Sequence, residues 1–126
     1  MLISEKSILK IIKIGDNVYE NINIRENKPW FSNLVSQGLD KLKEIVKDTI
    51  RYIAWKELMK TDWIITKIFE IQLQGGDIEE AISKYSNILE YRKAVRDWCN
   101  NKEEDINQIE DVNSLLMIDI DDLPKL

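Results

Sequence analysis

The 126-residue sequence contains no histidine and a single cysteine, Cys99. Without histidine, the chain lacks the commonest general base and the commonest metal ligand. A lone cysteine cannot form an intrachain disulfide or a cysteine-based zinc site, and Cys99 has no histidine to activate it as a nucleophile. An enzyme would need an Asp/Glu or Lys mechanism, for which no site is visible. We therefore expect a protein that is not an enzyme, with no catalytic residues, no metal and no cofactor.

Long apolar runs are missing as well. No stretch reaches the roughly 18 consecutive apolar residues of a membrane-spanning helix. At the N-terminus, Lys6, Lys10 and Lys13 interrupt every apolar run, which does not fit a signal peptide. There is also no internal repeat and no glycine-rich phosphate loop. The sequence thus predicts no membrane partner and synthesis in a reducing cytoplasm.

Charge is distributed unevenly along the chain. Residues 1–60 hold 11 basic and 8 acidic side chains, a net charge of +3, whereas residues 61–126 hold 7 and 15, a net charge of −8. Eight acids and no base lie between Glu103 and Asp122. A nucleic-acid-binding protein would normally carry a compact basic patch, so we expect no direct nucleic-acid partner. An acidic inhibitor that blocks a basic, nucleic-acid-binding groove of a host protein is the alternative function that this pattern allows.

The apolar content is high enough for a folded core. Apolar residues make up 44% of the chain, and they include 21 isoleucines, four tryptophans and four tyrosines. A small domain has difficulty hiding that many large side chains, which indicates contact surfaces for other proteins. We expect a mainly α fold, a small bundle of four to five helices with an N-terminal β-hairpin and an acidic C-terminal tail. The expected domain is 1–101, with a hairpin at 8–24 and helices over 32–101, and the expected tail is 102–126.

The hairpin is predicted from isoleucine-rich runs on either side of Gly15-Asp16-Asn17, a strong turn sequence. An isolated hairpin is marginally stable in water. Its strands should therefore either pack on the helices or pair with a strand from another chain.

Two helices are expected before residue 75. Pro29 disfavours helix at Lys28, so residues 25–32 read as a connector, followed by one long helix from Ser32 or Asn33 to about Lys60 with Gly38 as a weak point. After a Thr61-Asp62 cap, the helix from Trp63 to about Leu73 is apolar nearly all round. Such a helix is either central or buried by a partner.

The second half of the chain should hold shorter helices. Gly75-Gly76 ends the apolar helix, and Asp77 caps a short amphipathic one. A further helix should start at Ser86-Asn87 and end near Asn100-Asn101, followed by a separate acidic helix over Glu103 to Asp111. The remaining tail alternates acidic and apolar residues, which is typical of a segment that is bound by a partner or packs back on its own chain. Its aspartates lack the spacing of a calcium loop.

One stretch resembles a known family. Thr61-Asp62-Trp63 followed by a helix reading Tyr91-Arg92-x-Ala94-x-Arg96-Asp97 is similar to the short helical region of phage tail assembly chaperones and tail-fibre assembly proteins. The resemblance covers about a third of the chain, residues 61–98. Two departures stand out: Val95 replaces a leucine, and the gap between the two parts is long and lacks a proline, with Gly75-Gly76 supplying the break.

The resemblance implies a non-catalytic protein that binds a phage tail or tail-fibre structural protein in the host cytoplasm during assembly. Retention in the virion and the oligomeric state stay open. The candidate interaction residues are Trp63, Tyr91, Arg92, Arg96, Asp97 and Trp98. Within this set we expect the two tryptophans to be packing anchors.

The arginine pair carries a prediction of its own. Arg92 and Arg96 lie four residues apart, so on a helix they repel unless a carboxylate lies near both. Asp97 points about 100° away from Arg96 and cannot easily bridge the pair. The acid should come from Asp62, from residues 103–111 or from another molecule, and the alternative is a pair splayed into solvent.

Overall fold

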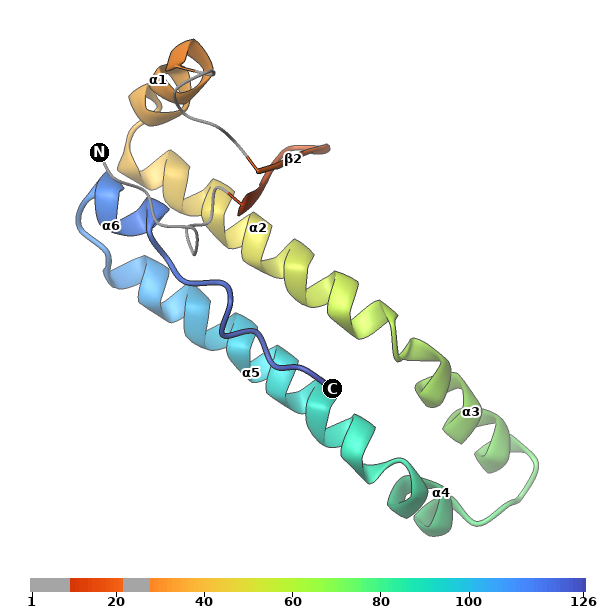
Figure 1. Cartoon of the computed structure of the whole chain (residues 1–126). Coiled ribbons are helices and arrows are strands. Elements are labelled where there is room, and N and C mark those ends of the chain that lie inside the picture. The colour runs from red at the N-terminus through yellow and green to blue at the C-terminus, as the bar shows by residue number, and fades with distance from the viewer. Residues whose placement is uncertain (1–9, 22–27) are drawn as a thin grey trace.

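The computed structural model describes residues 10–21 and 28–126, which form a mainly helical fold with one antiparallel hairpin (Figure 1). This confirms the expected fold class. The elements in the described residues are β1 (Ile11–Ile14), β2 (Asn17–Glu20), α1 (Lys28–Ser36), α2 (Leu39–Met59), α3 (Asp62–Leu73), α4 (Ile78–Lys84), α5 (Ser86–Gln108) and α6 (Val112–Leu116).

The core forms where the two long helices, α2 and α5, run antiparallel along the length of the molecule (Figure 1). Both helices repeat apolar residues at helical spacing, and those side chains meet between them. Each fully buried Leu, Ile or Val side chain stabilises the fold by about 1.5–3 kcal/mol relative to an exposed one. The fully buried apolar members of this core are Ile12, Leu34, Leu42, Val46, Ile50, Val95, Ile106, Leu115 and Leu116.

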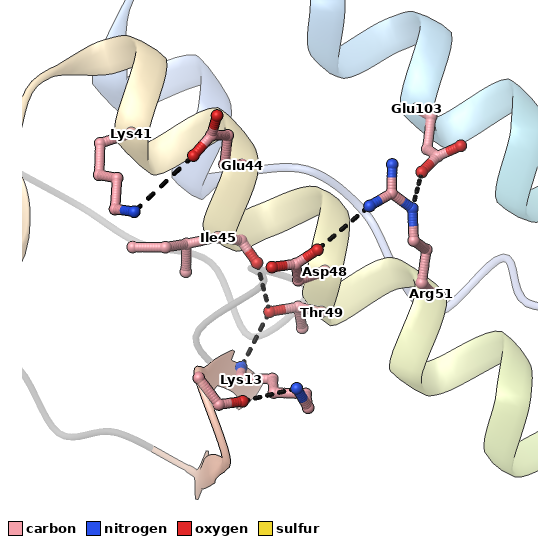
Figure 2. A network of polar contacts seen from close by, with 9 residues as sticks. Lys13, Lys41, Glu44, Ile45, Asp48, Thr49, Arg51 and Glu103 are labelled. Carbon is pink, nitrogen blue, oxygen red and sulfur yellow. Dashed lines mark hydrogen bonds and ion pairs between the residues drawn. The ribbon is translucent and has the colours of Figure 1, made fainter.

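The hairpin packs on α2. Ile12 of β1 is fully buried in the core, and its neighbour Lys13 donates its backbone N–H to Thr49 Oγ1 at 2.8 Å. The same buried hydroxyl donates to the Ile45 carbonyl at 2.9 Å (Figure 2). Of the two sequence-based alternatives, the structure thus shows packing on the helices. Residues 8, 9 and 22–24 of the predicted hairpin lie outside the described residues.

Two predictions about the first helices are wrong. Lys28 is helical, because Pro29 falls in the first turn of α1, where a missing N–H leaves no intrahelical bond unmade. The single helix expected up to Lys60 is divided into α1 and α2 at Gly38, which has a φ of 90°. Only glycine adopts that conformation easily, so the predicted long helix is interrupted at Gly38.

The predicted end of the last long helix is also wrong, because α5 continues without interruption to Gln108. Its second half is fixed to α2 by polar contacts: Lys43 Nζ donates to the Asn107 carbonyl at 3.1 Å, and Arg51 bridges Asp48 and Glu103 (Figure 2). The boundary expected between residues 101 and 102 therefore falls inside a helix.

The C-terminal segment packs back on α5 (Figure 1). Asp122 accepts hydrogen bonds from Trp98 Nε1 at 2.9 Å and pairs with Lys102 Nζ at 2.8 Å. Burial alone would raise the pKa of Asp122, but the hydrogen bonds from Lys102 and Trp98 outweigh it and hold the pKa below its ordinary value. Deprotonated Asp122 thus holds the tail against the helix by a charge-assisted contact.

Replacing Thr49 with valine should remove the bond that holds β1 to α2 at nearly constant volume. Because the Lys13 N–H would then lose its acceptor, we expect the free energy of unfolding to fall by about 1–2 kcal/mol in urea denaturation. Ser36→Ala, which removes the exposed hydroxyl bonded to the Asn33 carbonyl, is the control and should change it by less than about 0.5 kcal/mol. Equal effects of the two changes would contradict the role given to Thr49.

Candidate protein-binding surface

Arg92 of α5 contacts both the end of α2 and the start of α3. Its guanidinium projects from α5 and is almost fully buried, with 9% of the residue exposed. Nη1 donates to the Leu58 carbonyl at 2.7 Å and to Thr61 Oγ1 at 2.8 Å, and it lies 3.0 Å from Asp62 Oδ1. These acceptors stand where α2 ends and α3 begins. We call this set (Leu58, Thr61, Asp62 and Arg92) the Arg92 clamp.

The clamp has a plain physical cause. Carbonyls in the last turn of a helix lack an intrahelical partner, and a buried one needs a donor. Arg92 supplies that donor at the end of α2, together with the Thr61 N–H at 3.1 Å. The guanidinium is partly neutralised by the Asp62 carboxylate, so a buried positive charge is tolerated there. The clamp therefore fixes the direction in which α3 leaves α2.

A second contact lies beside the clamp. The Tyr91 hydroxyl donates to Glu57 Oε2, and Lys60 Nζ lies 2.7 Å from Glu57 Oε1. Burial first, and then the hydrogen bond to Glu57, raise the pKa of Tyr91 to about 12. The hydrogen bonds from Lys60 and Tyr91 lower the pKa of Glu57. These groups and residues 123–126 line an open groove of about 380 Å³.

The arginine-pair prediction is right for Arg92 and wrong for Arg96. Arg92 meets Asp62, one of the acids predicted from the sequence. Arg96 is exposed and forms no ion pair within residues 10–21 and 28–126. Because Arg92 is buried and Arg96 is in water, the repulsion between the two charges is screened. The pair therefore does not need a shared acid.

The Thr61 prediction also needs correction. Thr61 occupies the N-cap position of α3, but its side chain makes no capping hydrogen bond. Its hydroxyl donates to the Leu58 carbonyl at 3.3 Å and accepts from Arg92 instead. Asp77, in contrast, caps α4 as predicted, since its side chain accepts from the Glu80 N–H at 3.1 Å.

Beyond the clamp, α3 and α4 form a helical pair, which we call the tip (residues 62–84). It lies at the end of the molecule opposite the hairpin, α1 and α6 (Figure 1). Only Ile64 and Ala81 are buried within it, and neither belongs to the core between α2 and α5. The tip is thus attached to the core without contributing to it.

The outer side of the tip is apolar. Ile65, Phe69 and Leu73 recur at four-residue intervals on α3, so they form one stripe, and they are 46%, 57% and 71% exposed. Trp63 is 53% exposed and meets the Tyr85 ring edge-on at 6.0 Å. Seven of the ten large exposed apolar side chains in the described residues lie within 55–82. These seven are Trp55, Met59, Trp63, Ile65, Phe69, Leu73 and Ile82.

The six candidate interaction residues divide into two groups. Tyr91, Arg92 and Trp98 are buried inside the chain, so they support the fold. Arg96, Asp97 and Trp63 are exposed, and Asp97 pairs with Lys93 at 3.5 Å. The prediction that Trp98 is a packing anchor is confirmed. The same prediction for Trp63 is wrong, because the inward side of α3 is occupied by Ile64, Ile68 and Ile71.

Ile65, Phe69 and Leu73 were not among the candidate residues from the sequence, although their spacing could have identified them. Besides its inward stripe, α3 has a second apolar stripe at 65, 69 and 73, and one small neighbour, α4, cannot cover both. The sequence predicted that this helix is either central or buried by a partner, and among the described residues it is not central.

Other kinds of site find no support in the described residues. They hold no group of acidic or cysteine side chains that could bind a metal, and none of their helices is long and apolar enough to cross a membrane. Cys99 is half-buried, and burial raises the pKa of its thiol, which disfavours the reactive thiolate.

No protein-family model, no curated protein and no solved structure matches the chain.

The two arginines provide a matched test of the clamp. Arg92→Ala should lower the free energy of unfolding by about 2–4 kcal/mol, because buried acceptors lose a charged donor. Arg96→Ala, one turn further along the same helix, should change it by less than about 0.5 kcal/mol. Urea denaturation of both variants measures the difference, and similar values would contradict the clamp.

Because the pKa of Tyr91 is raised in the folded state, we expect the free energy of unfolding to fall in alkali. Its pKa rises from 10.0 to about 12 on folding, so its contribution is fully present below pH 10 and is lost as the pH rises toward about 12. Denaturation between pH 9 and about 12 should therefore show a steeper fall for the wild type than for Tyr91→Phe. Parallel curves would show that the hydroxyl titrates alike in the folded and unfolded states.

Proposed function

We propose that the chain is a non-catalytic assembly or adaptor protein whose tip binds another protein. The observation that carries this proposal is the concentration of exposed apolar side chains on α3 and α4, outside the core. They are Trp63, Ile65, Phe69, Leu73 and Ile82. Monomeric proteins rarely leave large contiguous apolar surfaces in water, and such surfaces usually mark interaction sites.

Covering the exposed apolar side chains of the tip with a partner would be energetically favourable. Completing the burial of one large apolar side chain is worth a fraction of the about 1.5–3 kcal/mol for full burial, and aromatic anchors dominate many interfaces. Trp63 and Phe69, each about half exposed, are the candidate anchors. The clamp fixes α3 before any partner binds. Binding would therefore cost little conformational entropy for ordering this surface.

The partner we propose is a phage tail or tail-fibre structural protein, with binding in the host cytoplasm during assembly and retention in the virion as an open second step. This narrower proposal rests on the sequence resemblance. Three of the residues that carry the resemblance, Thr61, Asp62 and Arg92, meet in the clamp that positions the tip. In this proposal they present the binding surface and do not themselves touch the partner.

The acidic-inhibitor alternative has less support. Of the acids near the C-terminus, Glu103 contacts Arg51, Asp121 contacts Lys10 and Asp122 contacts Lys102. Asp111 caps α6 by accepting from the Ser114 N–H. Carboxylates engaged within the chain contribute less to a basic groove on another protein.

A charge placed on the outer stripe should abolish binding without unfolding the protein. Phe69→Asp adds a carboxylate at an exposed position, so thermal unfolding should change little. Met117→Asp, 44% exposed at the end of α6, is the matched control. The measurement is co-purification with co-expressed tail and tail-fibre structural proteins.

We expect the wild type and Met117→Asp to retain one such structural protein and Phe69→Asp to lose it. Retention by Phe69→Asp would move the contact away from the tip. If the wild type retained none of the structural proteins, the proposed assembly function would be wrong.

A further inference from the structure

Acidic side chains outnumber basic ones in the tip, which carries the apolar stripe. Residues 62–84 contain five acids and two bases, a net charge of −3. The five acids are all exposed. They are Asp62, Glu70, Asp77, Glu79 and Glu80.

Most of this negative charge is not neutralised within the chain. Asp62 pairs with Arg92, and Asp77 caps α4. In the part of the chain that the structure describes, Glu70, Glu79 and Glu80 take part in no ion pair. Lys84, one of the two bases, lies over the Tyr85 ring at 5.4 Å. The three glutamates are therefore available to a partner.

Two of these acids, Glu70 and Glu79, lie next to exposed apolar side chains. Glu70 precedes Leu73 by three residues, and Glu79 precedes Ile82 by three. Residues three apart are neighbours on a helix surface. An apolar centre with a charged rim is the usual anatomy of a protein–protein interface. In the tip the rim is mainly acidic, because the exposed bases Lys67 and Lys84 are outnumbered by five exposed acids.

A rim with a net negative charge discriminates between occupants. In a two-fold dimer the same patch of both copies meets, so the acids of one tip would face those of the other. Like charges brought together across an interface are strongly disfavoured. A partner with lysines or arginines around an apolar surface would instead gain from each facing pair.

On the basis of the proposed function, we infer that the tip binds a different protein, through an apolar surface bordered by lysines or arginines. A second copy of this chain does not occupy it. The stripe supplies the apolar contact, and Glu70, Glu79 and Glu80 select the sign of the partner's rim.

Two synthetic amphipathic helices test this inference on the full-length protein. Both carry the same leucine face, flanked by lysines in one peptide and by glutamates in the other. With several rim pairs worth about 0.2–1 kcal/mol each, we expect the lysine peptide to bind roughly tenfold or more tightly than the glutamate peptide. Fluorescence anisotropy of labelled peptides measures both affinities, and the preference should shrink as salt rises.

Two triple variants show which acids cause the preference for the lysine peptide. Glu70→Gln/Glu79→Gln/Glu80→Gln should lose most of it. Glu104→Gln/Asp105→Asn/Glu110→Gln, which neutralises three exposed acids outside the tip, should keep it. Sedimentation velocity should show a monomer for the wild type.

Four results would overturn the inference: a preference that is equal in both triple variants, binding of the two peptides without preference, no binding of either peptide, or a dimer that Phe69→Asp dissociates. A dimer of that kind would leave the tip a protein-binding surface. The proposed assembly function is judged separately, by retention of a tail or tail-fibre structural protein.

Discussion

The position of α3 and α4 depends on one buried side chain. The Arg92 guanidinium satisfies the carbonyl of Leu58 at the end of α2 and holds the first residues of α3. A buried cation is costly in a protein interior unless it has acceptors and a counter-charge. This site supplies both to Nη1, whereas the buried Nε has no hydrogen-bond partner in the described residues. If α5 were displaced, the Leu58 carbonyl would keep the Thr61 N–H at 3.1 Å but would lose its charged donor.

This constraint divides the molecule into two parts with different tasks. Between the hairpin end and residue 58, α2 and α5 bury their apolar faces against each other, β1 and α6, and this packing supplies the stability. Past the clamp, α3 and α4 bury little and expose much. Small domains are only marginally stable, and exposed apolar surface carries a risk of aggregation. In the proposed function, a partner protein covers this surface.

Much of the architecture could be predicted from local sequence. The hairpin turn at Gly15-Asp16, the end of α3 near Gly75-Gly76 and the Asp77 cap follow from short-range conformational rules, and the structure has all three. The candidate surface was predictable in part, since an all-round apolar helix signals a need for cover. What failed depended on tertiary context. Trp63 could not be placed inside or outside without knowing which side of α3 faces α4.

The end of α5 illustrates the same limit. The polar run from Asn100 to Glu104 has the composition of a helix end, yet Lys102 is buried there. It is buried because Asp122, twenty residues further along the chain, folds back onto it. Neither residue reveals this pairing by its local sequence. For the arginine pair, the sequence predicted that a carboxylate was needed. It did not show that the carboxylate would pair with Arg92 alone.

The central claim is that the tip is held beside the core without being part of it. Native-state amide hydrogen exchange of the free protein tests this most directly, because it resolves the free energy of opening along the chain. We predict that amides in α3 and α4 open at a clearly lower free energy than those of α2 and α5, and that Arg92→Met lowers protection further in α3. Amides of the tip that exchange only through global unfolding, with the same free energy as the core, would contradict the account.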